Sequence, residues 1–145
     1  MRRHGFTFIE LLVVVTIVGL LSSIAVPRYR LMKQRAQATN VLADLQVVRV
    51  AVLNYYADYQ EFPQEAAAGV APPNLQKYLP VGFGFQRETW SMDYDIVSGA
   101  GVNGDLVGVS AATLDEELGR IVMAMLGTNA TIMINGRLTF FISGM

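Results

Sequence analysis

The chain has 145 residues, of which 52% are hydrophobic, and its formal net charge is −1. This length fits one domain with at most a short appended segment, and the near-neutral charge excludes the strongly basic face typical of nucleic-acid binders. The sequence contains no cysteine and a single histidine, His4, which excludes disulfides and thiolate metal sites. Because His and Cys supply most general bases, nucleophiles and zinc ligands, we expect neither an enzyme nor a cofactor.

The first predicted elements are a short basic leader and a membrane-spanning helix. Arg2 and Arg3 precede Gly5, and the 21 residues from 6 to 26 are apolar or small except for Glu10. As a helix this stretch would span roughly 31 Å, at about 1.5 Å per residue, which is enough to cross the hydrocarbon core of a bilayer. The basic leader would keep the N-terminus cytoplasmic and direct the rest of the chain outward.

Glu10 is the informative residue of this helix. A charge within a membrane segment costs about 2.5–3.5 kcal/mol on insertion scales and normally marks a function. Cleavage after Gly5 would give Phe6 a free α-amino group one helical turn from Glu10. The carboxylate could then pair with that amine or with the amine of a neighbouring subunit. The alternative is that Glu10 only snorkels to the cytoplasmic surface.

The residues around this carboxylate form one continuous run, Gly5-Phe6-Thr7-Phe8-Ile9-Glu10-Leu11-Leu12-Val13-Val14. The run resembles the class III signal of type IV prepilins and type II secretion pseudopilins. By this resemblance, a prepilin peptidase/methyltransferase cuts after Gly5 and methylates the amine of Phe6, and Glu10 docks on a neighbour's N-terminus during assembly. The resemblance also implies a homo- or hetero-polymer of pilin-like subunits and an inner-membrane assembly platform as partners.

Gly19 and Pro27 predict a weak stretch in the membrane helix. Proline removes the hydrogen bond back to residue 23, and glycine adds backbone freedom. In filaments of the similar family this stretch is often unwound, so we predict that the helix melts between Gly19 and Pro27 on assembly. An ordinary kink is the alternative.

Four cations follow the membrane segment directly, at positions 28, 30, 33 and 35. Their position opposes the usual bias, which places Lys and Arg on the cytoplasmic side of a membrane segment. They are expected to pair with neighbouring subunits or with anionic headgroups. A conventional secretory signal is the competing interpretation of the N-terminus, since Ser23-Ile24-Ala25 fits the small-residue cleavage pattern. The long apolar run and the carboxylate at its start argue against it.

A second helical pattern continues beyond the membrane segment. Apolar residues recur at spacings of three and four, which predicts one helix reaching about Asp58: Ala38, Val41, Leu45, Val48, Val52, Tyr55 and Tyr59. Pro63 cannot continue a helix. The predicted organisation is a leader peptide (1–5), a transmembrane or filament-core helix (6–27), an amphipathic helix continuing into the head (28–62) and a globular head (63–145).

The head is predicted to be α+β. Alternating residues and a two-residue Asn-Gly turn indicate four strands, over residues 89–97, 105–110, 131–134 and 137–142. Thr113 with Glu116 forms a capping-box pattern that opens a short helix with Leu114, Leu118, Ile121, Val122 and Met125 on one face, stopped by Gly127. The fold class is therefore pilin-like: a long N-terminal helix packed on a small antiparallel sheet of about four strands, with one short extra helix.

Three carboxylates of the head are calcium candidates, because some major pseudopilins of the similar family bind calcium in a C-terminal loop. Asp93, Asp95 and Asp105 lack the dense ligand spacing of an EF-hand loop. Asp93 and Asp95 are expected to project from the solvated face of a strand instead. No metal is therefore predicted.

The function implied by the resemblance is a non-enzymatic structural subunit of a type IV pilus-like filament or a type II secretion pseudopilus. Before assembly the subunit would be a single-pass protein of the bacterial inner membrane, in contact with lipid, with its C-terminal head in the periplasm. Afterwards it would lie in a periplasmic or cell-surface filament. The alternative is a single-pass, membrane-anchored periplasmic binding domain that does not polymerise.

Overall fold

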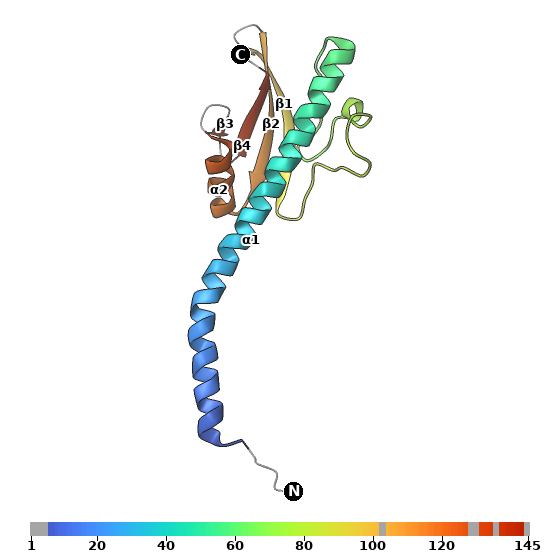
Figure 1. The fold of residues 1–145 in the computed structure, drawn as a ribbon. Helices are drawn as coiled ribbons and strands as arrows, with labels where there is room; N and C mark the ends of the chain where they lie inside the picture. Colours follow the sequence, from blue (N-terminus) through green and yellow to red (C-terminus); the bar gives the residue numbers. More distant parts are fainter. Residues whose placement is uncertain (1–5, 102–103, 128–130, 135–136, 144–145) are drawn as a thin grey trace. The chain divides into compact units, whose positions relative to one another are not determined.

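The computed structural model describes residues 6–101, 104–127, 131–134 and 137–143. The chain separates into two compact units, Met1–Gln34 and Arg35–Met145. Its elements in chain order are α1 (Phe8–Tyr59), the short 3-10 helix η1 (Pro73–Leu75), β1 (Trp90–Gly101), β2 (Gly104–Thr113), α2 (Glu116–Leu126), β3 (Thr131–Ile134) and β4 (Arg137–Ser143) (Figure 1).

Helix α1 is continuous over 52 residues, which confirms the prediction of a single helix ending near Asp58. Its second half buries one stripe of side chains, namely Ala38, Val41, Leu45, Val48, Ala51, Val52 and Tyr55. Tyr59, which the pattern assigned to this stripe, is 54% exposed in the last turn. The helix ends because Gln60 adopts a left-handed φ of 59°, and Pro63 follows shortly after.

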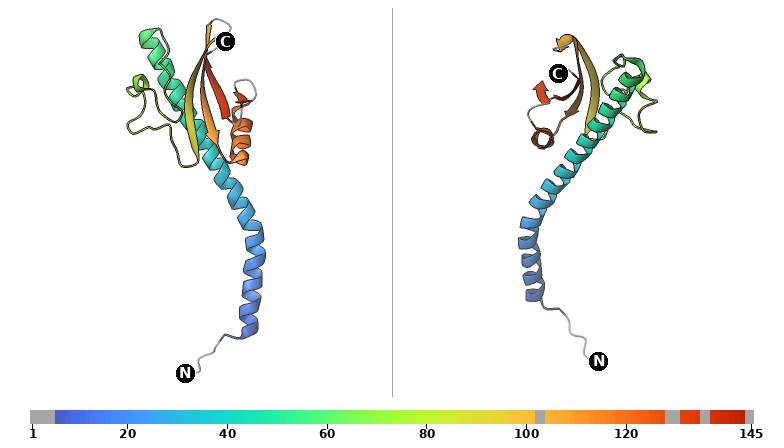
Figure 2. Two further views of the ribbon diagram at one scale, coloured as in Figure 1. Left: turned by 180° about the vertical axis from the view of Figure 1, so that it is seen from behind. Right: turned by 45° about the horizontal axis from the view of Figure 1, so that its top comes forward.

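The head contains a four-stranded antiparallel sheet with the order β1-β2-β4-β3. The first two strands form a hairpin whose register runs from Trp90↔Thr113 to Val97↔Leu106 before an irregularity near the turn. Strand β4 lies between β2 and β3 (Figure 2). The predicted fold class is thus confirmed, with β1 and β2 both longer than expected. The predicted Asn135-Gly136 turn lies outside the described residues.

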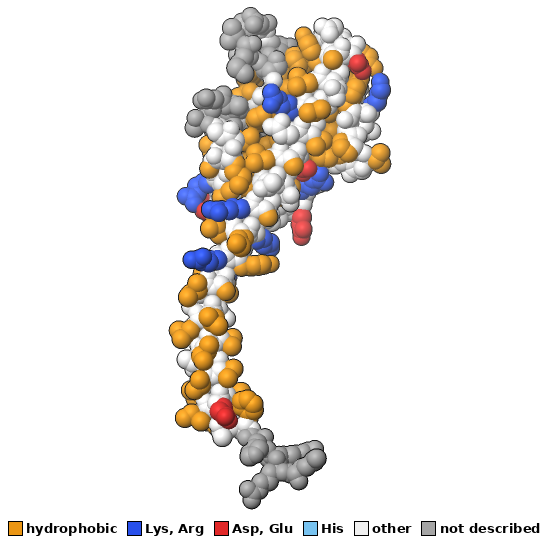
Figure 3. Space-filling view, viewed as in Figure 1, with side chains coloured by type: hydrophobic (Ala, Val, Ile, Leu, Met, Phe, Trp, Pro, Cys, Tyr) orange, Lys and Arg blue, Asp and Glu red, His pale blue; other side chains and the backbone are white. Residues whose placement is uncertain are grey.

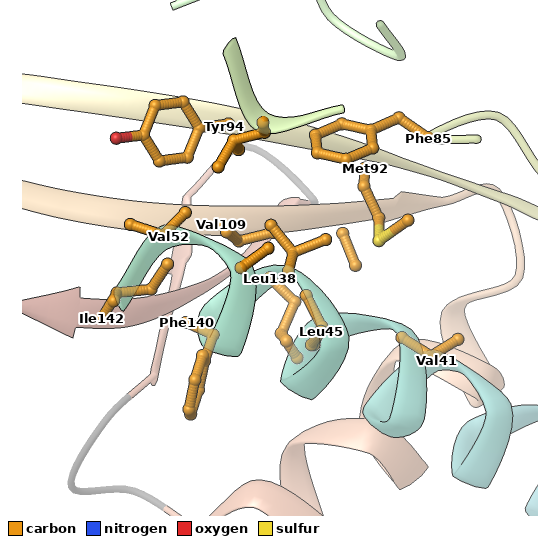
Figure 4. Packing of buried hydrophobic residues seen from close by; sticks show 14 of the residues in the cluster. Val41, Leu45, Val52, Phe85, Met92, Tyr94, Val109, Leu138, Phe140 and Ile142 are labelled. Carbon is orange, nitrogen blue, oxygen red and sulfur yellow. The ribbon is translucent and has the colours of Figure 1, made fainter. Parts of the chain in front are cut away.

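The core of the head lies between the sheet and the second half of α1. Alternate residues of the strands face the helix, since successive side chains point to opposite faces of a sheet. Figure 4 shows Leu45 and Val52 of α1 packed against side chains from three strands, among them Met92, Tyr94, Val109, Leu138, Phe140 and Ile142. Helix α2 joins the same core through Leu118 and Val122.

The predicted N-cap of α2 is wrong. Asp115, not Thr113, caps the helix, and its carboxylate accepts hydrogen bonds from the backbone N–H groups of Glu117 and Leu118 at 3.0 and 3.1 Å. Strand β2 continues to Thr113, whose hydroxyl donates to the carbonyl of Thr89 across the hairpin. The predicted apolar face is correct for Leu118 and Val122, which are buried, and for Ile121, which packs against the core. Leu114 and Met125 are instead 103% and 46% exposed. The predicted stop at Gly127 is confirmed.

The connector between α1 and β1 is held against the helix by two polar contacts. Arg87 makes a two-pronged ion pair with Asp44, at 2.8 and 3.0 Å, and this geometry is the strongest form of such a pair. Tyr78 donates its hydroxyl proton to Asp58 at 2.5 Å, and this bond raises the pKa of Tyr78. The connector also buries Phe85 completely in the core.

Candidate functional site

The first half of α1 is an apolar surface. All residues from Phe6 to Lys33 are exposed, and Figure 3 shows hydrophobic side chains along the segment, with acidic side chains only near its start. An 18-residue window of the helix has a mean hydropathy of 2.5, so α1 is long and apolar enough to cross a membrane by length and composition. Such a surface is normally covered by lipid or by other protein.

Glu10 lies at the N-terminal end of this surface, in a capping box with Thr7. The Glu10 carboxylate accepts hydrogen bonds from both the backbone N–H and the hydroxyl of Thr7, each at 2.8 Å. In return, the Thr7 hydroxyl accepts a bond from the Glu10 N–H at 3.3 Å. Two backbone donors at the helix end are thereby satisfied, and the arrangement fixes the direction in which the carboxylate points.

Thr7 is a site residue that the sequence analysis missed. The signal was present, because Thr7 and Glu10 have the spacing of a capping box. That pattern was assigned to Thr113 and Glu116 instead, where it does not cap the helix.

The predicted cleavage site lies at the edge of the described residues. Gly5 lies outside them, and Phe6 is 81% exposed. Phe6, Ile9 and Val13 line an open groove together with Glu10. In the uncleaved chain the nitrogen of Phe6 is still part of a peptide bond, so the predicted pairing of Glu10 with an α-amine stays a prediction.

Gly19 and Pro27 both lie within the continuous helix. Between them, the hydroxyl of Ser23 donates to the carbonyl of Leu20 at 2.7 Å, a bond that competes with regular helical hydrogen bonding. The hypothesis that this stretch melts concerns the assembled state, so it stays a prediction. The helix of the single chain contains Gly19 and Pro27, which would weaken its hydrogen bonding there.

The carboxylates Asp93 and Asp95 lie on the sheet face opposite the core. The expectation that Asp93 is solvated is wrong, because its residue is 6% exposed and its carboxylate forms an ion pair with Arg137 of β4. Asp95 accepts a hydrogen bond from the hydroxyl of Ser110 at 3.3 Å. The side chain of Asp105 lies outside the described part of the chain.

The environment of Asp95 raises the pKa of its carboxyl group above the ordinary value. Burial raises the pKa of this carboxyl, and the charge of Asp93 raises it further, while Arg137 and the bond from Ser110 act in the opposite direction. Among the described residues no three His, Cys, Asp or Glu side chains gather as a metal site. The arrangement is one cross-strand ion pair, between Asp93 and Arg137, beside one cross-strand hydrogen bond, between Asp95 and Ser110.

Comparisons with known proteins agree with this geometry. Residues 1–26 match the prokaryotic N-terminal methylation motif. The chain is 39% identical over 71 residues to the type IV major pilin protein PilE1 of Neisseria gonorrhoeae, covering 49% of the chain and 33% of that pilin. It is 33% identical to fimbrial protein EcpC of Eikenella corrodens (77% of the chain, 65% of that protein). It is 29% identical to type II secretion system core protein G of Klebsiella pneumoniae, over 67% of the chain and 76% of that protein.

The matches to the gonococcal pilins span only 33% to 44% of the length of those proteins. The fold is similar to that of the major type IV pilin PilA1 from Clostridium difficile, with a TM-score of 0.53 at 16% identity, covering 75% of this chain and 96% of that one. The motif covers the apolar half of α1, including Glu10, and the fold is similar to that of a type IV pilin. The chain thus carries the N-terminal methylation motif, and it is similar to type IV pilins and to a type II secretion system core protein.

Proposed function

We propose that the chain is a non-enzymatic structural subunit of a type IV pilus-like filament or a type II secretion pseudopilus. The observation that carries this proposal is the exposed apolar half of α1, which matches the methylation motif over residues 1–26 and has its single carboxylate at its N-terminal end. A surface of this kind is stable only in lipid or packed against similar helices. The relatives named as pilins and as a secretion-system core protein support the second environment.

The proposed sequence of events starts in the bacterial inner membrane. The apolar half of α1 spans the bilayer, the head lies in the periplasm, and a prepilin peptidase/methyltransferase cuts after Gly5 and methylates Phe6. An inner-membrane platform then moves the subunit from the bilayer into a filament. Helix–helix contacts replace helix–lipid contacts there, so the exchange requires little net change in apolar burial.

The proposed role of Glu10 is to neutralise the amine of Phe6 on a neighbouring subunit. An unpaired charge within a packed apolar bundle is strongly unfavourable, about 3–5 kcal/mol when one partner of a buried pair is removed. The capping box holds the carboxylate at the helix end, so little conformational entropy is lost when the amine approaches. Subunits without the carboxylate would leave the amine unpaired.

The experiment compares Glu10→Gln and Glu10→Leu with Thr16→Val as a control in the same helix. The hydroxyl of Thr16 donates to the carbonyl of Leu12 and lies away from the helix end. We expect all variants to insert in the membrane and to begin at methylated Phe6 by intact-mass and N-terminal analysis. Both Glu10 variants should lower the yield of sheared filaments at least about tenfold, since one pairing is lost at each subunit contact.

Two results would contradict the proposal. Normal filament yield from Glu10→Leu would contradict the proposed pairing of Glu10 with the amine of Phe6. A native N-terminus at Met1 or Val26 would contradict processing after Gly5. The non-polymerising alternative is tested with pairs of cysteines introduced between positions 6 and 26, in a chain that has no cysteine of its own. Crosslinked ladders then form only if the helices pack together.

A further inference from the structure

Three of the four cations that follow the apolar half of α1 lie within the unit Met1–Gln34. Arg28, Arg30 and Lys33 are exposed, and the side chains of Tyr29 and Met32 between them are 69% and 70% exposed. Figure 3 shows Lys and Arg side chains gathered at the end of the apolar segment that lies opposite its acidic end. We refer to Arg28, Arg30 and Lys33 as the basic collar.

The chain offers these cations no nearby counterion. In the sequence no acidic residue lies between Glu10 and Asp44. Within the described part of the chain, the ion pairs involve only Arg87, Arg120 and Arg137. The positive charge of the basic collar is therefore available to an anionic partner outside the chain.

The depth of the basic collar matches the surface of a bilayer. The 22 residues from Phe6 to Pro27 span about 33 Å as a helix, and the hydrocarbon core is about 30 Å thick. If Phe6 lies at one interface, Arg28 is the first residue to reach the other. Tyr29 is placed there as well, at the level where aromatic rings are enriched in membrane proteins.

The spacing of the cations favours lipid over a protein partner. At about 100° per residue, Arg30 lies roughly 200° and Lys33 roughly 140° around the helix axis from Arg28. Arg30 and Lys33, about 60° apart, therefore share one side of the helix, and Arg28 lies on roughly the opposite side. A neighbouring protein would meet one side of the helix, whereas headgroups surround a membrane helix on every side.

We propose that the basic collar binds the phosphates of anionic phospholipids in the leaflet from which the head emerges. Cations on this side oppose the usual charge bias of membrane insertion, and binding to anionic headgroups offsets that disadvantage by roughly fivefold in membrane affinity per cation. The basic collar thereby sets the depth of the helix before assembly. This inference rests on the membrane anchoring within the proposed function, and it holds whether or not the subunit polymerises.

The test uses the full chain in nanodiscs of equal parts phosphatidylglycerol and phosphatidylcholine. Native mass spectrometry then measures which lipid the released protein retains. The variant Arg28→Gln/Arg30→Gln is compared with Lys77→Gln/Arg120→Gln, which removes two charges from the surface of the head. We expect the parent and the control to retain phosphatidylglycerol preferentially, and the collar variant to lose at least about fivefold of that preference.

Three outcomes would overturn the inference: no preference in the parent chain, an unchanged preference in the collar variant, or an equal loss in the control. Filament yield is measured in parallel, so that failure of this inference is distinguished from failure of the proposed function. A collar variant with normal lipid preference and reduced filament yield would assign the cations to a neighbouring subunit instead.

Discussion

At the residue scale, the ion pair between Asp93 and Arg137 joins two strands that are not neighbours in the sheet. Asp93 lies in β1 and Arg137 in β4, with β2 between them, and the residues are 44 positions apart in the chain. The side chain of Asp93 is 9% exposed and that of Arg137 is 40% exposed. The pair therefore spans the outer face of the sheet with its carboxylate largely withdrawn from water.

Removal of the cationic partner should destabilise the head. Arg137→Gln leaves a buried carboxylate without its charged partner, so we expect a loss of about 1–3 kcal/mol in the free energy of unfolding. The measurement is chemical unfolding of the detergent-solubilised chain. Arg120→Gln is the control, since its ion pair with Glu117 is exposed and should contribute about 0–1 kcal/mol. Equal losses in the free energy of unfolding for the two substitutions would contradict a special stabilising role of the Asp93–Arg137 ion pair.

Asp95 gives a pH-dependent prediction. Its pKa is raised in the folded chain from an ordinary value of 3.8, first by burial and then by Asp93, so the folded state binds the proton more tightly than the unfolded state. Stability from this group is present at low pH and is lost as the pH rises from 3.8 through the higher folded pKa. Asp95→Asn should therefore be more stable than the parent at neutral pH, with the difference shrinking in acid.

The measurement for Asp95 is thermal unfolding between acidic and neutral pH. Asn can still accept the hydrogen bond from Ser110, so the substitution removes mainly the charge. Glu88→Gln, at an exposed position before β1, should not reproduce the effect. A stability difference that is the same at every pH would show that packing, and not ionisation, separates Asp95→Asn from the parent.

At the element scale, the long helix and the strands could be predicted from the sequence. The residue that caps α2 and the point where β2 ends could not. The period of the apolar residues determines which side chains of α1 face the core, since that pattern is local. By contrast, both Thr113 and Asp115 are good N-caps by type. Thr113 is excluded only because β2 pairs with β1 up to that residue, which is a contact made far along the chain.

The carboxylates of the sheet illustrate the same difference. The alternation in β1 correctly placed Asp93 opposite the core. Its ion-pair partner is Arg137, whose position follows from the order β1-β2-β4-β3 and not from any local pattern. Thr7 was different, because its capping box with Glu10 is local and could have been predicted.

Pro27 gives the prediction for α1 itself. Proline in a helix interior removes one hydrogen bond and costs about 3 kcal/mol or more, so Pro27→Ala should strengthen the segment that we expect to melt. A filament of the parent chain should show non-helical backbone between Gly19 and Pro27. A filament of Pro27→Ala should retain more helix there and form in lower yield. Continuous helical hydrogen bonding through this segment in the parent filament would refute the melting hypothesis.

At the scale of the whole molecule, the hydrophobic core lies entirely within the unit Arg35–Met145. We therefore expect a chain that begins at Arg35 to unfold cooperatively without lipid or detergent. Within that fragment, Leu45→Ala should cost about 2–5 kcal/mol, because Leu45 is fully buried. Leu53→Ala is the matched control, since Leu53 is 41% exposed. A gradual, non-cooperative melting curve of the fragment would contradict the expectation.

The position of β4 inside the sheet has a consequence for the timing of export. It is the last of the four strands in chain order, yet both β2 and β3 pair with it. If the head crosses a membrane as proposed, β3 would have no partner in the sheet until β4 has also emerged, so the sheet would close only after the last strand is translocated.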